Sequence, residues 1–304
     1  MAIMDDLAAQ RASVVILAYN KAQHTARCLN GLLHTSWRPL EVVLLDNGST
    51  DGIPDVFDSF EERAGNAEIH VKRLRNESNL GAATGRNQAL ERASGRLVAF
   101  MDNDVVVRSR DWIERLARTL ASHDKAGIAG PKLIYPFPPF LIQCAGGAVS
   151  PTGRVFFRGR GEPNESPRFG QEEEVQCLIS ACWLMRRDVF EDVGGLDEAY
   201  NPVQFEDIDF CYKARAAGWR VFYNPAAEMY HFENVTTSGS PTINSPYQIV
   251  KNGLLFKRRW QHAYSREAGP REEDWHWAEI PTVRLDSIGP LEMTGGTSAR
   301  ETSS

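Results

Sequence analysis

Two carboxylates flank a single residue in the segment Asp102-Asn103-Asp104, directly after the apolar stretch 96–101. At the end of a strand, both carboxylates can reach one hard divalent cation, which typically binds through a few carboxylates together with ligand phosphates. Such a cation would neutralise a departing diphosphate. The alternative is a solvated turn, because Asp and Asn favour turns in any case. By itself, this segment leaves both interpretations open.

A second acidic segment, from Phe205 to Phe210, interleaves Glu206, Asp207 and Asp209 with bulky apolar residues. Three carboxylates among apolar neighbours favour a pocket in which one carboxylate acts as a general base. One or two of them would also serve simply to satisfy the N-terminus of a helix. The segment therefore contains a candidate base, with a capping role as the alternative.

Two further groups could bind metal or phosphate. His231 stands between two aromatic residues, and its imidazole could complete a metal site, although such a histidine is commonly a packed core residue. Asn79 and Gly81 precede a helical stretch that carries Arg86. Gly81 would allow close backbone approach and Arg86 could pair with a phosphate, whereas the simpler alternative is a helix N-terminus with a surface arginine.

These residues follow a series of buried strands that alternate with helices. Apolar, β-branched stretches predict strands over 13–18, 41–45, 69–74 and 96–101, and apolar periodicity predicts helices over 23–33, 54–64 and 84–93. This alternation predicts an α/β fold with a mostly parallel sheet covered by helices on both faces. Polar residues at 19–20, 46–51 and 102–104 follow three of the strands, and ligands of such sheets bind beyond the carboxyl ends of the strands.

The second half of the chain is less regular. Helices are predicted over 111–122, 188–193, 207–217 and 245–260, and strands over 175–186 and 220–223. Residues 130–172 are rich in Pro and Gly and predict a functional loop or short hairpins. From about residue 265 the chain is polar and patternless, although Trp275 and Trp277 could dock. We therefore expect an extension over 1–12, a domain over 13–262 and a polar, flexible tail over 263–304.

Composition excludes several classes of protein. The chain has 304 residues, 42% of them hydrophobic, and a net charge of −6, which predicts a folded protein and disfavours a nucleic-acid binder. Five scattered cysteines without C-x-x-C pairs predict reduced thiols in a cytoplasmic protein and disfavour both a disulfide framework and a zinc site. The acidic N-terminus predicts no signal peptide, and the lack of an apolar run of about 18 residues predicts no membrane span.

Four motifs in register resemble the family 2 glycosyltransferases, which have the GT-A fold. The matching segments are SVVILAYN, EVVLLDNGSTDG, NLGAATGRNQALERASGRLVAFMDND and DVFEDVGGLDEAYNPVQFEDIDFCYKARAAGW, and the match extends from Ser13 to His231. The resemblance implies an inverting enzyme that transfers a sugar from a nucleotide-diphosphate sugar to an acceptor hydroxyl. It also implies a nucleotide-binding half, 13–107, and an acceptor-binding half, 108–262, with a small acceptor-side subregion.

The resemblance further implies roles for individual residues. Around the nucleotide and the rest of the donor it places Ala18, Tyr19, Asn20, Asp46, Asn47, Asn79, Gly81, Arg86, Asp102 and Asn103. At a divalent metal, Mn²⁺ or Mg²⁺, it places Asp102, Asp104 and His231. It implies Asp207 as the general base, with Glu206 as the alternative. Asn47 and Asn103 depart from the commonest family pattern, which leaves the choice of nucleotide open.

Substrates and rival functions remain to be distinguished. UDP-sugars are the favoured donors, with dTDP- and GDP-sugars as alternatives, and the acceptor could be a glycan, a lipid-linked molecule or a small molecule. We expect acceptor contacts from Trp183, Asp197 and Glu198. The helix around 248–259 mixes apolar and basic residues and could touch the inner face of a membrane, although closing the domain is its simpler role.

A protein of a different class would be a catalytically silent sugar- or nucleotide-binding chain that keeps the fold. The presence of every carboxylate named above disfavours this alternative. A sugar nucleotidyltransferase or a dinucleotide oxidoreductase would need a Gly-rich loop after the first strand, and residues 18–21 do not form one.

Overall fold

The computed structural model describes residues 10–233, 235, 245–271, 273, 278, 280, 281 and 283–295. Of the expected N-terminal extension it describes residues 10–12, and Trp275 and Trp277 lie outside the described residues. No described helix combines the length and the apolar composition that crossing a bilayer would require.

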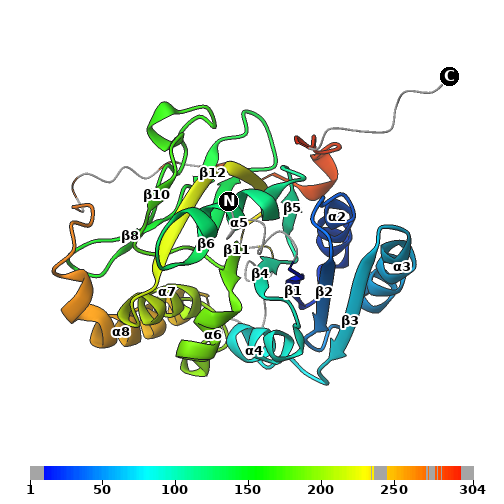
Figure 1. The fold of residues 1–304 in the computed structure, drawn as a ribbon, viewed down its shortest axis with the longest axis horizontal. Helices are drawn as coiled ribbons and strands as arrows, with labels where there is room; N and C mark the ends of the chain where they lie inside the picture. The colour runs from blue at the N-terminus through cyan, green and yellow to red at the C-terminus, as the bar shows by residue number, and fades with distance from the viewer. Residues whose placement is uncertain are drawn as a thin grey trace.

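The first half of the chain forms four parallel strands in the order β4-β1-β2-β3 (Figure 1). They are β1 (Ala12–Ala18), β2 (Leu40–Asp46), β3 (Ile69–Arg75) and β4 (Leu97–Asp102), and they alternate with α2 (Ala22–Leu32), α3 (Ile53–Asn66) and α4 (Ala82–Arg92). In the register, Ala18 lies opposite Asp46 and Leu17 lies opposite Asp102. The three polar clusters therefore meet at one edge of the sheet, as the sequence predicted.

The second half continues the same sheet through an antiparallel strand, β11 (Cys182–Arg186), which lies between β4 and β6 (Ala126–Ile134). The long strand β12 (Arg220–His231) runs parallel to β6. Shorter antiparallel strands complete this half, namely β5 (Val105–Val107), β7 (Ile142–Cys144) and β10 (Glu173–Glu174) in the sheet and the separate pair β8 (Gly147–Val149) and β9 (Val155–Phe157). The predicted α/β fold is thus confirmed, with a mostly parallel but mixed sheet.

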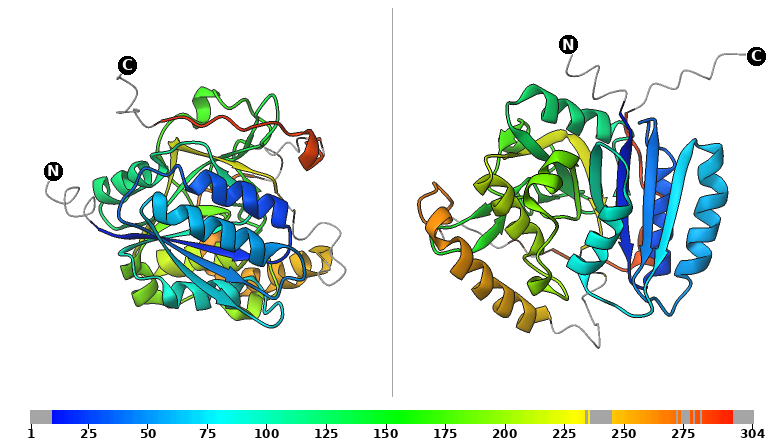
Figure 2. Two further views of the ribbon diagram at one scale, coloured as in Figure 1. Left: turned by 90° about the vertical axis from the view of Figure 1, so that its right-hand side faces the viewer. Right: turned by 60° about the horizontal axis from the view of Figure 1, so that its bottom comes forward.

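Helices cover both faces of this sheet, and successive residues of β1 show why. Val14 and Ile16 belong to the core beneath α2, α3 and α5 (Trp112–Ser122), whereas Val15 belongs to the core beneath α4, α6 (Arg187–Val193) and α7 (Glu206–Ala216). The last helix, α8 (Ser245–Tyr264), packs through Phe256 and Trp260 on Tyr212 of α7 and lies at the outer edge of the molecule (Figures 1 and 2). Within the described residues, 3₁₀ helices span Pro167–Phe169, Glu198–Tyr200 and Leu285–Ser287.

Three predicted strand boundaries were wrong. The strand expected over 175–186 comprises only residues 182–186, because the buried apolar residues before it pack in the core, with a single bridge from Cys177 to Gly147. Residues 130–134, expected in a loop, belong to β6. The strand expected over 220–223 continues to His231, because an irregularity between Asn224 and Glu228 absorbs the turn-forming residues and pairing with β6 resumes beyond it.

The tail expected to be flexible is docked where the structure describes residues 283–295, which Figure 2 shows running beside α2. The Arg27 guanidinium donates hydrogen bonds to the carbonyls of Leu285 and Ile288 at 3.3 and 3.1 Å. The backbone N–H of Thr294 donates to the carbonyl of Arg108 at 2.6 Å. Helix α8, which was predicted over 245–260, ends at Tyr264 and so extends beyond residue 262, the predicted end of the domain.

Candidate active site

A cavity of about 590 Å³ collects most of the predicted residues. The first half of the chain contributes Tyr19, Asn47, Asn79, Arg86, Asp102, Asn103 and Asp104 to its lining, and the second half contributes Glu206, Asp207 and His231. The cavity therefore joins the polar edge of the parallel strands to the start of α7. This is the position at which open α/β sheets bind ligands.

Asp102, Asp104 and His231 form a cluster whose potential ligand atoms all lie within 4.8 Å of one another. The His231 Nε2 atom lies 3.3 Å from Asp104 Oδ1, and the backbone that brings them together is the pairing of β12 with β5, which places His231 opposite Val105. Two carboxylate oxygens and one imidazole nitrogen suit Mn²⁺ or Mg²⁺ and leave positions for phosphate and water. The donor set thus fits the predicted metal site.

Gln143 orients the histidine of this cluster. Its side-chain oxygen lies 2.6 Å from His231 Nδ1, and its amide nitrogen donates to the backbone carbonyl of His231 at 3.3 Å. A proton on Nδ1 that is held by this amide oxygen leaves the Nε2 lone pair directed at the cluster, which is the arrangement seen in metal-binding histidines. No motif predicted this role, because Gln143 lies in the region expected to be a loop.

Burial and mutual charge set the ionisation of the cluster. Burial raises the pKa of Asp102, and the neighbouring Asp104 carboxylate raises it further. Burial acts in the same direction on Asp104, but His231 outweighs it and lowers the pKa of that carboxyl. Burial lowers the pKa of His231, yet the Asp104 carboxylate outweighs burial and raises it overall. A cation bound here would take over the role that the histidine proton plays beside Asp104.

Asn103, between the two carboxylates, makes hydrogen bonds that connect β4 to neighbouring parts of the chain. Its side-chain amide is buried and donates to Thr25 Oγ1 at 2.9 Å, and it lies 3.4 Å from the carbonyl of Asn20. The amide thereby ties the end of β4 to α2 and to the segment after β1. Asn103 lines the cavity without joining the metal-ligand cluster.

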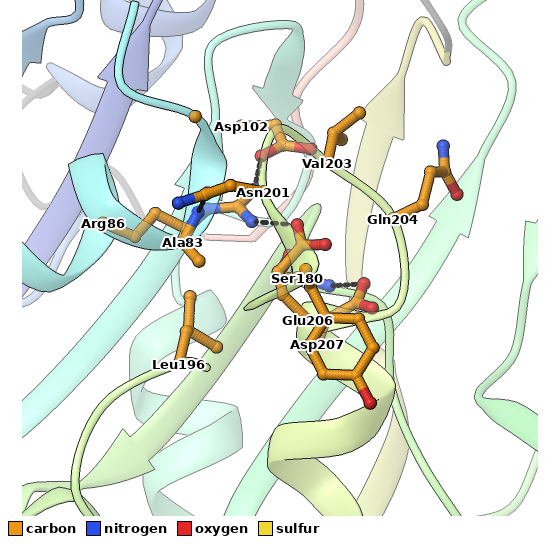
Figure 3. A network of polar contacts seen from close by, with 12 residues as sticks. Ala83, Arg86, Asp102, Ser180, Leu196, Asn201, Val203, Gln204, Glu206 and Asp207 are labelled. Carbon is orange, nitrogen blue, oxygen red and sulfur yellow. Dashed lines mark hydrogen bonds and ion pairs between the residues drawn. The ribbon is translucent and has the colours of Figure 1, made fainter. Parts of the chain in front are cut away.

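Arg86 links the metal cluster to the acidic pair on α7 (Figure 3). Its guanidinium pairs with the Asp102 carboxylate and donates to Glu206 Oε1 at 3.0 Å. The arginine is buried, and it lies 5.9 Å from the centre of the Phe100 ring. The residue that was expected to pair with a donor phosphate is therefore paired with two carboxylates from opposite sides of the cavity.

Glu206 and Asp207 are held in different ways. Asp207 accepts a backbone N–H group on each oxygen. Ser180 donates at 3.0 Å (Figure 3), and Ile208 donates at 2.7 Å. Glu206 accepts from Arg86 on Oε1, while its buried Oε2 has no hydrogen-bond partner. Burial, together with the adjacent Asp207 charge, raises the pKa of Glu206 to about 7. Burial also raises the pKa of Asp207, against the opposing effect of its backbone donors and Arg86.

The loop before α7 is clamped between two helices. Asn201 accepts the backbone N–H of Ala83 at 3.1 Å, and the Pro202 carbonyl accepts that of Ala82 at 2.7 Å, so this loop caps the N-terminus of α4. The buried Asn252 amide on α8 donates to the carbonyls of Tyr200, Val203 and Gln204 at 2.7 to 2.9 Å. The clamp holds Gln204 and Phe205 at φ values of 85° and 74°, which are costly for residues other than glycine.

Asn47 lines the cavity and also holds residues 76–81, the donor-side loop between β3 and α4, in place. Its side-chain nitrogen donates to Asn79 Oδ1 at 2.9 Å and to the Gly81 carbonyl at 3.3 Å. Its side-chain oxygen accepts from Asn76 and from the backbone N–H of Leu80. An aspartate would lack the two donors, which explains physically why Asn fits at this position.

Four other predicted donor residues do not line the cavity. Ala18 is fully buried in β1, and Asp46 accepts the N–H of Ser49 at 2.8 Å and pairs with Arg75 at 3.3 Å. Asn20 accepts the N–H of Thr50 at 2.9 Å. Gly81 has φ +91°, and a Cβ there would collide with the side chain of Asn201. The close approach expected at Gly81 is thus made by a side chain of the second half.

The three residues expected at the acceptor lie elsewhere. Trp183 is fully buried between Phe100 and Phe210, because it points from β11 into the core on the α7 side of the sheet. Asp197 pairs with Arg259 of α8 at 2.7 Å, and Glu198 lies 3.4 Å from the Asn87 amide. The cavity wall opposite the donor residues is formed instead by the β8–β9 hairpin, the loop before α7 and α8, through Arg154, Phe156, Phe157, Arg160, Val203, Phe205 and Ile249.

The model of Glycosyl transferase family 2 matches residues 13–194. The chain belongs to this family. An N-acetylglucosaminyl-diphospho-decaprenol L-rhamnosyltransferase from Mycobacterium tuberculosis is 31% identical over 254 residues, which cover 75% of this chain and 78% of that protein. The uncharacterized protein y4gI of Sinorhizobium fredii is 30% identical over 232 residues, but the chain spans only a quarter of its length.

Solved structures agree on the fold. The mannosyltransferase PcManGT from Pyrobaculum calidifontis, solved with GDP-Man and Mn²⁺, matches 86% of this chain and 66% of its own with a TM-score of 0.58 at 18% identity. The family 2 chain therefore has the expected GT-A fold. Among the described residues, Asp102, Asp104 and His231 are the group of three side chains that could hold a metal ion. The relatives bear on the enzyme class, whereas the roles of single residues rest on the geometry above.

Proposed function

We propose that this family 2 chain is an inverting, metal-dependent glycosyltransferase that moves a sugar from a nucleotide-diphosphate sugar to an acceptor hydroxyl. One observation carries the proposal: the candidate metal ligands and the acidic pair Glu206 and Asp207 line the same cavity. A metal site serves a departing diphosphate, and a carboxylate serves an attacking hydroxyl, so the reaction needs both on one substrate.

In the proposed reaction Asp207 is the general base. Its carboxylate removes the acceptor proton while the acceptor oxygen bonds to the anomeric carbon, and the bond from that carbon to the diphosphate oxygen breaks with its electron pair. The backbone N–H groups of Ser180 and Ile208 fix the carboxylate, and a carboxylate with two donors retains lone pairs for the proton. Attack from the face opposite the diphosphate inverts the anomeric centre.

Asp102, Asp104 and His231 would hold the cation, Mn²⁺ or Mg²⁺, which supplies positive charge to the departing diphosphate. Arg86 opposes the effect of burial by lowering the pKa of both Asp102 and Glu206, which favours the negative charge that attracts the cation. Glu206 is the alternative base, because its Oε2 has no hydrogen-bond partner.

The donor and acceptor are proposed at the level of class. UDP-sugars remain the favoured donors, with dTDP- and GDP-sugars as alternatives, and the acceptor is a glycan, a lipid-linked molecule or a small molecule. The relative from M. tuberculosis is named for an acceptor on a diphospho-decaprenol, which favours the lipid-linked class. All five cysteines are free and buried, which supports a reducing, cytoplasmic setting.

A donor panel tests this proposal. The protein is incubated with UDP-, GDP- and dTDP-sugars in the presence of Mn²⁺ or of a chelator, and release of nucleotide diphosphate is measured. We expect slow hydrolysis of one donor that requires the metal and is lost in Asp104→Ala. Absence of hydrolysis together with absence of nucleotide binding would overturn the proposal, whereas binding without hydrolysis even with acceptors present would favour a silent binding protein.

A further inference from the structure

Helix α8 carries most of the exposed large apolar side chains in the described part of the chain. Among its large apolar side chains, five are exposed, and four of these lie on α8: Tyr247, Ile249, Val250 and Leu254, which are 47 to 62% exposed. The fifth, Leu80, lies outside α8, on the loop between β3 and α4. Figures 1 and 2 both show α8 at the edge of the molecule, with its outer side uncovered by other described elements.

Helical spacing separates this outer face from the buried one. Tyr247, Val250 and Leu254 follow one another at intervals of three and four residues, so they share one side of the helix. Asn252, Phe256 and Trp260 are buried on the opposite side. The apolar side chains are thus exposed although the helix has a well-packed inner face, which means that closing the domain does not account for them.

The charge of this helix is opposite to that of the whole chain. Residues 245–266 contain five Lys or Arg and no Asp or Glu, whereas the chain carries a net charge of −6. Lys251 and Arg258 are exposed and, at intervals of three to four residues from Leu254, share the face with the apolar residues. A helix with apolar and basic residues on one exposed face has the composition that binds in the interface of an anionic bilayer.

The cavity opens beside this face. Ile249 of α8 lines the cavity, as does the exposed Arg154 of the β8–β9 turn. The neighbouring Gly153 abuts the basic end of α8, because a Cβ added there would lie 3.0 Å from Lys257 Cγ. Asn252 connects the same helix to the loop that precedes Glu206 and Asp207. A surface bound to α8 would therefore face the acceptor side of the cavity.

We propose that the outer face of α8, defined by Tyr247, Val250, Lys251, Leu254 and Arg258, docks the protein on an anionic lipid bilayer and turns the cavity toward an acceptor anchored there. The acceptor class rests on the proposed glycosyltransferase function, whereas the docking surface does not. A second copy of the chain is a poorer occupant, because pairing two such faces would bring like charges together.

Vesicle binding tests the surface directly. The full chain is sedimented with vesicles of phosphatidylcholine alone and of phosphatidylcholine with 30% phosphatidylglycerol. We expect binding to the anionic vesicles only, weakened about tenfold or more in V250Q/L254Q, which removes apolar contact, and in K251Q/R258Q, which removes charge. Leu80→Gln, the same kind of change at the exposed apolar side chain that is not part of α8, should bind like the wild type.

Three results would overturn the docking proposal: wild-type protein that stays in the supernatant, equal loss of binding in Leu80→Gln, or a concentration-dependent dimer that V250Q/L254Q abolishes while vesicles are ignored. Donor hydrolysis in detergent-free buffer separates this failure from that of the proposed function. Both double variants should hydrolyse the donor at the wild-type rate without vesicles. Absence of both donor hydrolysis and nucleotide binding in the wild type would contradict the proposed enzyme, whatever the vesicles show.

Discussion

Arg86 is the residue on which the electrostatics of the cavity depend. Without it, Asp102, Asp104, Glu206 and Asp207 would place four carboxylates around one buried space with His231 as their counter-charge. The arginine pairs with one carboxylate of each set and remains buried itself. A buried pair that loses one partner leaves an uncompensated charge, so the cavity is stable only as a complete network.

Glu206 makes stability depend on pH in a direction that can be tested. Its pKa is raised to about 7 from the ordinary 4.5, so the folded protein binds a proton that the unfolded chain releases between these values. Stability from this group is therefore lost as pH rises through that range, by at most about 3 kcal/mol. Glu206→Gln cannot ionise, and we expect its free energy of unfolding to gain on the wild type between pH 5.5 and pH 8.

Denaturant unfolding of both proteins at the two pH values measures this difference. Glu62→Gln, which removes an exposed glutamate, serves as the control and should shift the free energy equally at both pH values. If the free energies of unfolding of Glu206→Gln and the wild type differ by the same amount at both pH values, burial does not raise the pKa of Glu206.

Gln143 offers a prediction about the metal site. Gln143→Leu removes the acceptor for His231 Nδ1–H, and such partners commonly contribute 10- to 100-fold in metal affinity. We expect calorimetric Mn²⁺ binding to weaken by about that factor, while Gln143→Glu, which keeps an acceptor oxygen, retains it. Unchanged binding in the leucine variant would mean that the amide does not orient the histidine.

Single residues were predictable where motif and strand end coincided. Asp102, Asp104 and His231 come together as expected, because the carboxyl ends of neighbouring parallel strands share an edge and β12 returns to it. Gln143 had no signal, since a lone glutamine in a Pro- and Gly-rich stretch has no motif. Trp183 was wrongly expected at the acceptor because the sequence does not show which face of β11 points into the core.

Among the secondary-structure elements, the strands of the first half begin and end close to where the apolar pattern predicts, whereas several strands of the second half do not. Buried β-branched strands between amphipathic helices fixed the limits of β1 to β4 to within about two residues. Pro131 suggested a loop, yet it lies in β6 just beyond the residues that pair with β11, where that side of the strand needs no N–H donor. The strand predicted over 220–223 likewise continues, as β12, past an irregularity between Asn224 and Glu228.

The coupling of α8 to the active-site loop gives the prediction at this scale. Asn252→Leu keeps the volume of the side chain but removes the two amide hydrogens that three backbone carbonyls share. Each unsatisfied buried group costs about 1–3 kcal/mol, and the loop would lose its hold on Glu206 and Asp207. We expect a lower melting temperature and a kcat for donor hydrolysis reduced about tenfold or more.

The matched control is Val250→Leu, a change of apolar volume on the exposed side of the same helix, which should leave kcat unchanged. Wild-type kcat in Asn252→Leu would show that α8 supports the fold without positioning the loop.

At the scale of the whole molecule, the cavity exists because two halves of different character share one sheet. The parallel half contributes the loop between β3 and α4 and the candidate metal ligands Asp102 and Asp104, and the mixed half contributes His231 and the acidic pair across the antiparallel strand β11. Arg86 and Asn201 then join the halves, through Glu206 and through the N-terminus of α4. Neither half holds a complete site, which explains why short motifs were informative only in combination.

Asp207, as the proposed base for sugar transfer, is the residue whose replacement is most informative. The most direct measurement is the turnover of Asp207→Asn on the donor that the panel identifies, together with calorimetric binding of that donor. We predict kcat at least about 100-fold below the wild type, as for removal of a general base, with donor affinity within about threefold. Wild-type turnover in Asp207→Asn would contradict the account, and a comparable loss confined to Glu206→Gln would assign the base to Glu206 instead.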